Sequence, residues 1–179
     1  MKRLWMIVLI AGIARGADVT AWITGEEVLI NAVRWSATQQ ATQMFDAIGV
    51  SLEWAKARPS VSEGAQIEVR FTTHTAWPKP GALAFSTPFD PKPVVTVLYD
   101  RIVFLTTANP GNRARLLAHV LAHEFGHVLM RSTAHSCDGV MKTQWTLLDH
   151  QRMVYRPLPF LPSDAQAIRD SLATFAARK

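Results

Sequence analysis

Two histidines and a glutamate stand at a spacing that suits metal chemistry. His123 and His127 are four residues apart in a segment expected to be helical, so both imidazoles leave one face of the helix, one turn apart. Their ring nitrogens could meet one tetrahedral Zn²⁺ at roughly 2.0–2.1 Å each. Glu124 follows the first histidine on the rim of that face, where its carboxylate can bond a water rather than the metal. We therefore expect a zinc site on this helix.

The expected chemistry is hydrolysis of a peptide bond by metal-activated water. Zinc lowers the pKa of a bound water to about 7. Glu124 would take its proton as general base and return it to the leaving amine. The alternative is a hydrogen-bonded structural cluster. We disfavour it because the preceding apolar residues indicate a buried helix, and such a helix rarely carries two histidines and a glutamate without partners. Those apolar residues are Leu116, Leu117, Val120 and Leu121.

A catalytic zinc needs a third protein ligand and one open position. His135 is the first choice, because the chain can turn at 131–133 after the helix and bring this residue back to the metal. The alternative is an exposed loop histidine. His119 shares the general helix face but lies about 12 Å from His127 along the axis, so we expect a supporting or packing role for it. The rival third ligands are Cys137, Asp138, Asp149 and His150.

The segment HEFGHVLMRSTAHSCDGVMKTQW, residues 123–145, resembles the metzincin group of zinc peptidases. Their pattern is HExxHxxGxxH followed by a methionine turn beneath the metal, and Met141 looks like that methionine. Two positions depart from it: Met130 stands where the glycine belongs and Thr133 where the third histidine belongs, so His135 comes two residues late. The segment is more similar to a group of uncharacterised bacterial exported proteins that have a longer loop, an HS..G.M segment and a following tryptophan.

The resemblance implies a mixed sheet above the active-site helix and a C-terminal helix below it. In metzincins an edge strand above the cleft aligns the substrate through backbone pairing, and residues 83–86 are the candidate here. Trp145 is expected to pack near Met141. Tyr155 is a candidate for assisting the oxyanion.

The order of elements in the rest of the chain predicts a single α+β domain over residues 17–179. The resemblance implies that this domain is metzincin-like, with a mixed twisted sheet packed on a long N-terminal helix and the active-site helix, and with a C-terminal helix. Alternating or β-branched apolar residues predict strands at 19–23, 50–54, 67–72 and 94–99. Helical spacing predicts a helix from a capping box at Thr24 and Glu27 to about Ile48. Further helices are expected at 113–130 and, with Ser163 as N-cap, at 164–176.

The N-terminus predicts export. Lys2 and Arg3 precede a short apolar run at 4–13, and small residues follow, which is the pattern of a signal peptide over residues 1–16. Cleavage there would remove three cations and lower the formal net charge from +5 to +2. We therefore expect a secreted or periplasmic protein, anchored to the membrane if uncleaved. We expect a monomer with no stable membrane span after cleavage, no nucleic-acid partner and a peptide or protein substrate.

Three function classes follow from these residues. The first is a zinc metallopeptidase with one zinc per chain. The second is a non-catalytic zinc-binding module of the same fold, and the third is a zinc hydrolase acting on a non-peptide amide. Glu124 favours catalysis, because a structural zinc site has no need of a general base. Cys137 is the one cysteine of the chain, so an intramolecular disulfide is excluded.

Overall fold

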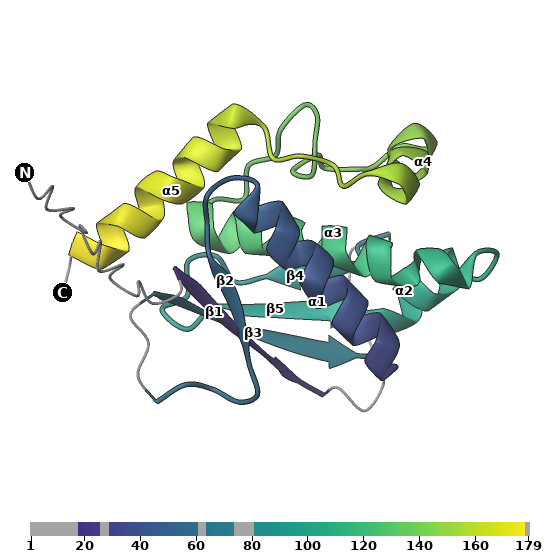
Figure 1. Ribbon diagram of the computed structural model, residues 1–179, viewed down its shortest axis with the longest axis horizontal. Helices are drawn as coiled ribbons and strands as arrows, with labels where there is room; N and C mark the ends of the chain where they lie inside the picture. The colour runs from purple at the N-terminus through teal and green to yellow at the C-terminus, as the bar shows by residue number, and fades with distance from the viewer. Residues whose placement is uncertain (1–17, 26–28, 61–63, 74–80, 178–179) are drawn as a thin grey trace, which may run out of the picture.

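The computed structural model describes residues 18–25, 29–60, 64–73 and 81–177 and has a five-stranded mixed sheet with helices packed on it (Figure 1). The sheet order is β2-β1-β3-β5-β4; the first four of these are parallel where they pair, and β4 runs antiparallel to β5. The expected fold class is confirmed. The strands are β1 (Val19–Thr24), β2 (Leu52–Ala55), β3 (Ala65–Thr72), β4 (Ala84–Ser86) and β5 (Val94–Leu98). The helices are α1 (Asn31–Asp46), α2 (Tyr99–Leu105), the 3₁₀ helix η2 (Pro110–Asn112), α3 (Arg113–Met130), α4 (Leu147–Tyr155) and α5 (Pro162–Ala177).

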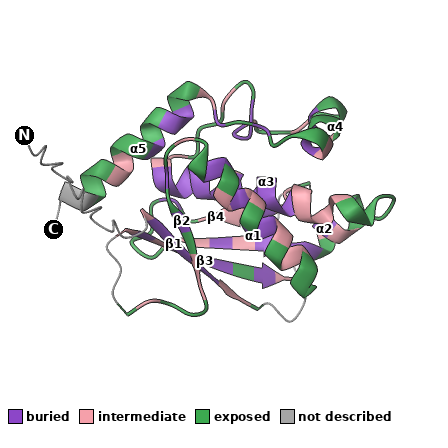
Figure 2. Ribbon diagram, viewed as in Figure 1, coloured by how far each residue is buried: buried purple, intermediate pink, exposed green. Residues whose placement is uncertain are grey.

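One face of the sheet is apolar, as the alternation in the sequence requires. In β3, Ile67 and Val69 are fully buried whereas Arg70 is exposed. The parallel register sets Ile67 beside Ala21 of β1 and Val69 beside Val95 of β5, so their side chains share one face. Figure 2 shows the buried residues concentrated where this face meets the helices.

α3, the helix predicted to carry the active site, lies in the core of the described structure. α1 connects the parallel strands β1 and β2 and packs along α3, where the rings of Phe45 and Phe125 lie 6.1 Å apart. α5 lies on the side of α3 away from the sheet (Figure 1). Phe160, just before α5, places its ring 5.1 Å from Phe45. α3 is therefore held between the sheet, α1 and the C-terminal segment.

The predicted start of the first helix is wrong. Thr24 is the last residue of β1, and its hydroxyl donates to Glu68 Oε1 at 3.1 Å, so it caps no helix. The expected partner Glu27 lies outside the described residues. α1 begins at Asn31 without a side-chain cap and ends at Asp46, two residues before the expected end. The apolar spacing identified the helix, but the polar residues before it belong to the strand.

Two α-helices were not predicted, and one cap was misplaced. α2 begins at Tyr99, directly after β5, at a residue predicted to belong to the strand. α4 is opened by a capping box in which Thr146 and Asp149 bond each other's backbone N–H groups. α5 begins at Pro162, so Ser163 lies within its first turn.

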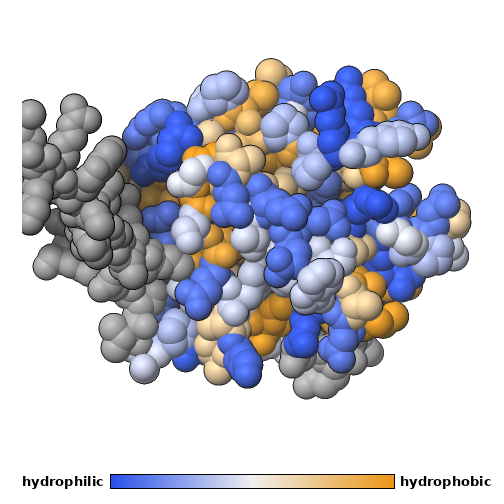
Figure 3. Space-filling view, in the orientation of Figure 1, coloured by the Kyte–Doolittle hydropathy of each residue, from blue (hydrophilic) through white to orange (hydrophobic). Residues whose placement is uncertain are grey.

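The described part of the chain contains no helix that is long and apolar enough to cross a membrane. The predicted signal peptide, residues 1–16, lies outside the described residues. On the face seen in Figure 3, hydrophilic residues predominate and hydrophobic ones form small separate groups.

Candidate metal centre

α3 carries the two predicted ligands and ends immediately after them. Met130, at the position of the metzincin glycine, is still helical, and the left-handed residue that ends the helix is Arg131 with φ 49°. The backbone N–H of Ser132 then donates to the His127 carbonyl at 3.1 Å. This turn reverses the chain and brings residue 135 back towards the helix.

His123, His127 and His135 come together. One ring nitrogen from each lies within 4.8 Å of the others. The ring centroids of His127 and His135 are 4.7 Å apart, and those of His123 and His135 are 5.3 Å apart. His127 is buried, His123 is half-buried and His135 is exposed, so the cluster opens to solvent on the His135 side.

Hydrogen bonds to backbone carbonyls orient the His123 and His127 rings so that their Nε2 atoms point towards each other. His123 Nδ1 lies 2.9 Å from the Val140 carbonyl, and His127 Nδ1 lies 2.9 Å from the Ser132 carbonyl. A carbonyl only accepts, so both Nδ1 atoms carry the proton when the rings are neutral and both Nε2 atoms are left as acceptors. These two Nε2 atoms are 3.0 Å apart. Two acceptors at that distance repel unless a cation or a proton lies between them, so the donor set fits a metal ion.

The electrostatic environment keeps these rings neutral, which is the form that binds a metal. Burial lowers the pKa of His123. Burial, together with the neighbouring His123, lowers the pKa of His127 to about 4. The two rings therefore stay unprotonated at neutral pH.

The loop that carries His135 is fastened at both ends. The backbone N–H of Ser136 donates to the Met141 carbonyl at 2.9 Å, and the Ser136 hydroxyl donates to Asp164 Oδ1 in α5 at 2.6 Å. Gly139 has φ +74°, and a Cβ there would lie 2.4 Å from the Pro159 carbonyl oxygen. That oxygen accepts the backbone N–H of Val140 at 2.8 Å. The Val140 carbonyl that orients His123 is thereby fixed by the segment before α5.

Met141 packs against the active-site helix at Gly126. It is fully buried, and a Cβ added to Gly126 would lie 2.4 Å from its sulfur and 3.3 Å from a ring carbon of Phe160. The glycine within the HEFGH motif is therefore a point of close approach between α3 and the loop that carries Met141.

Glu124 reaches the sheet. Its side chain is buried, and its Oε2 accepts the hydroxyl of Ser86, the last residue of β4, at 2.7 Å. The edge strand predicted at 83–86 is β4, and the contact of Ser86 with Glu124 was not predicted. The signal was weak, because the two residues are 38 positions apart.

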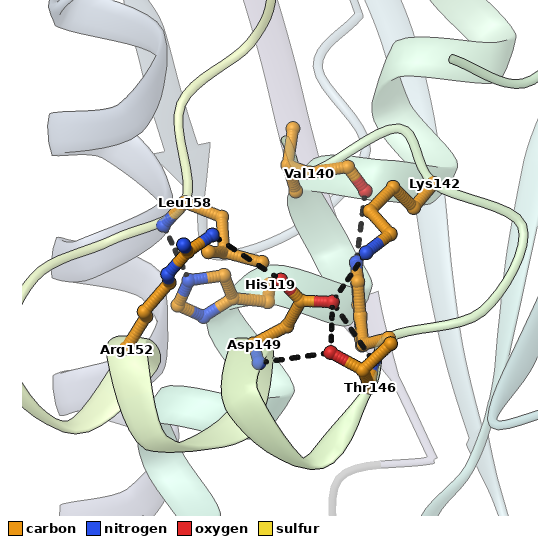
Figure 4. Close-up of polar contacts among 8 residues, drawn as sticks. His119, Val140, Lys142, Thr146, Asp149, Arg152 and Leu158 are labelled. Carbon is orange, nitrogen blue, oxygen red and sulfur yellow. Dashed lines mark hydrogen bonds and ion pairs between the residues drawn. The ribbon is translucent and has the colours of Figure 1, made fainter. Parts of the chain in front are cut away.

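His119 has a structural role. Its Nδ1 donates to the Arg115 carbonyl at 2.7 Å, and its Nε2 accepts the Leu158 backbone N–H at 3.0 Å. Burial lowers its pKa to about 4. Figure 4 shows the Leu158 backbone N–H directed at this ring. With both nitrogens used inside the fold, His119 ties α3 to the segment before α5.

Trp145 stands against the histidines of α3. Its ring is edge-on to His119 at 6.1 Å and to His123 at 5.8 Å between centroids. Its indole N–H donates to the Val140 carbonyl at 3.3 Å, the same oxygen that accepts from His123. Trp145 therefore contacts both the His123 ring and the carbonyl that orients it.

An ion pair between the half-buried Lys142 and the buried Asp149 follows Met141 along the chain. Lys142 Nζ lies 2.5 Å from Asp149 Oδ2, which also accepts the backbone N–H and the hydroxyl of Thr146 (Figure 4). Burial alone would raise the pKa of Asp149, but Lys142 and Thr146 hold it at about 2. α4 is thereby attached to the loop beside the site.

The other sequence candidates lie outside the cluster. Cys137 is exposed, and Asp149 is occupied by Lys142 and Thr146. The His150 ring lies 6.4 Å from that of Trp145, and neither it nor Asp138 is part of the three-histidine group. Tyr155, at the end of α4, is 89% exposed.

A cavity of about 410 Å³ lies away from the cluster, and no histidine lines it. Its walls come from the starts of β3 and β5, the end of α3 and the 88–93 loop, and include Arg58, Lys92 and Phe175. The three-histidine cluster thus faces the surface and is not part of this cavity.

Comparison with known proteins gives a fold-level match. No model of a protein family matches the chain, and neither does any curated protein. Among solved structures, the crystal structure of archaemetzincin from Methanopyrus kandleri matches with a TM-score of 0.54 and 13% identity, covering 92% of this chain and 99% of that one. The chain is similar in fold to archaemetzincin. Within that fold, the three-histidine cluster offers donors that could hold a metal ion.

Proposed function

We propose that the protein is a zinc metallopeptidase whose metal is held by His123, His127 and His135. The observation that carries the proposal is the convergence of these three histidines beside the buried carboxylate of Glu124. The likeness in fold to archaemetzincin supports it. Three histidines leave one position of a tetrahedral zinc for water or substrate, as a hydrolytic site requires.

The metal and the residues around it have separate roles in the proposed reaction. Zinc, when bound, supplies a Lewis acid that polarises a substrate carbonyl and acidifies a water. Glu124 accepts a proton from the attacking water and passes it to the leaving nitrogen. The Val140 and Ser132 carbonyls hold two rings in the tautomer that presents Nε2. Met141, in close contact with Gly126, takes the part of the metzincin methionine turn.

Two features favour a catalytic zinc over a purely structural one. His135 completes a set of three histidines, and Glu124 is present as a general base. The edge position and antiparallel direction of β4 favour a peptide, because an extended chain can pair with such a strand. Export and a monomeric state remain predictions from the sequence.

Glu124→Gln tests the function. The variant keeps the shape of the side chain but cannot accept a proton, so we expect zinc content to stay the same while the rate of casein cleavage falls by about 10²–10⁴. Cleavage of fluorescein-labelled casein and zinc content by atomic absorption are measured on the full chain. Glu53→Gln, an exposed carboxylate of β2, is the control.

Full cleavage by Glu124→Gln would remove Glu124 as the base. If the unchanged protein bound zinc but cut neither casein nor small amides, the non-catalytic module would replace the peptidase. Cleavage of amides alone would indicate the non-peptide hydrolase.

A further inference from the structure

Ser86 occupies a particular place in the sheet. It is the last residue of β4, which is the outermost strand next to β5. The register pairs Ser86 with Val95, whose side chain is fully buried on the helix-covered face. Because side chains of directly paired residues point to the same face, Ser86 points towards α3 and its neighbour Phe85 points away.

The hydroxyl of Ser86 meets the carboxylate expected to act as the base. Ser86 Oγ is 2.7 Å from Glu124 Oε2, and the hydroxyl donates because an ionised carboxylate only accepts. Glu124 itself is only 8% exposed. A hydrogen bond from a neutral hydroxyl to a charged oxygen is among the stronger ones in proteins, and a buried one fixes the rotamer of its acceptor.

We propose that Ser86 is a positioning residue that holds the Glu124 carboxylate at the metal centre. The inference rests on the proposed function, since it assigns Ser86 a task within that reaction. The bond crosses from the edge strand of the sheet to the active-site helix. A peptide that paired with the edge of β4 would therefore lie beside the strand whose Ser86 bonds the base.

A purely structural role makes different predictions. If the hydroxyl only fastened β4 to α3, its loss would loosen the edge strand and weaken substrate binding along with turnover. Thr87, the next residue, provides the matched control. Its hydroxyl accepts the Val94 backbone N–H at 2.9 Å and so fastens the same hairpin without touching Glu124.

The experiment compares Ser86→Ala, Ser86→Thr and Thr87→Ala as full chains loaded with zinc. For Ser86→Ala we expect kcat on a quenched fluorescent peptide to fall about tenfold while KM changes less than about twofold, because the lost interaction acts on the base rather than on substrate binding. Ser86→Thr keeps the hydroxyl and suits a strand, so it should recover kcat to within about threefold of the parent. Zinc affinity and the thermal midpoint of Ser86→Ala should match those of Thr87→Ala.

The outcomes are separable. Loss of kcat in Ser86→Ala, with recovery in Ser86→Thr and near-parental kcat in Thr87→Ala, supports the proposal. Equal losses in Ser86→Ala and Thr87→Ala, a loss confined to KM, or a kcat within twofold of the parent in Ser86→Ala overturns it and leaves the peptidase assignment intact. Absence of any hydrolysis by the zinc-loaded parent overturns both.

Discussion

Three histidines one turn apart on α3 differ in what their nitrogens bond. His123 and His127 each hydrogen-bond a backbone carbonyl through Nδ1 and direct Nε2 towards the cluster. In His119 both ring nitrogens bond backbone groups. The segments around α3 therefore decide which histidines can be ligands, because only a nitrogen without another partner has a lone pair to give a metal.

The buried His119 gives a prediction about acid stability. Its pKa is about 4 in the folded protein against an ordinary value of 6.5, so between these values the unfolded chain binds a proton that the folded chain does not. Stability is therefore full above pH 6.5 and falls as the pH drops towards 4, by on the order of 2–3 kcal/mol from this residue.

Urea unfolding of the metal-free protein at pH 7.0 and 4.5 measures this dependence. In His119→Gln, which does not titrate, the difference between the two pH values should be smaller than in the parent by that amount. An equal difference in both proteins would contradict the assigned burial of His119.

At the scale of the elements, α3 and the loop backing it meet through Gly126 and Met141. Alanine favours a helix over glycine by about 1 kcal/mol, so Gly126→Ala would stabilise an isolated helix. Here the new methyl group would lie 2.4 Å from the Met141 sulfur, so this fully buried side chain would have to shift, and it would press against the Phe160 ring at 3.3 Å. We expect net destabilisation of about 1–3 kcal/mol, the usual cost of overpacking.

Chemical denaturation provides the measurement, with Gly111→Ala as control because nothing lies within 4 Å of a Cβ there. The cost should shrink when Met141→Ala is combined with Gly126→Ala, since the two changes share one contact. Simple additivity of the two single changes would argue against the contact.

Sequence reasoning found the elements with long regular patterns. The bounds of α3 agree with the prediction, because an apolar helical pattern follows the break at 109–112. It failed where local signals compete. Thr24 reads as a helix cap but lies in a strand, and the apolar residues after Val94 continue without a break into α2. The start of α4 is marked by a short local signal, the capping box of Thr146 and Asp149, without a long apolar pattern after it.

The candidate site was readable only in part. The HExxH spacing is local, and so is the return of His135 after the helix end. The partners that orient these side chains come from elsewhere: Ser86 through the sheet register, and Val140 through a bond from its N–H to the Pro159 carbonyl. Such contacts depend on the packing of whole elements, which residue spacing does not specify.

At the scale of the molecule, a metal at the cluster would join the end of α3 to the loop that follows it. A ligand that binds only the folded state stabilises it by about 4 kcal/mol at a thousandfold excess over its Kd. For a chain of this length, that raises the unfolding midpoint by on the order of 10 °C.

We therefore expect EDTA to lower the midpoint of the zinc-loaded parent by that amount in differential scanning calorimetry. In His135→Ala the shift should be much smaller, because a ligand is lost. In His150→Ala, whose histidine lies outside the cluster, it should match the parent. Equal shifts in all three proteins would show that His135 is not a ligand.

The bonds from the loop to Pro159 and Asp164 have a consequence for co-translational folding. α3, with His123 and His127, is synthesised first, whereas the acceptors that bond Val140 and Ser136 are synthesised later. A nascent chain that stops before residue 159 lacks both of these anchors of the His135 loop, and one that stops before residue 164 lacks the second. If the cluster binds zinc as proposed, tight metal binding would require a polypeptide that has been synthesised and folded through the start of α5.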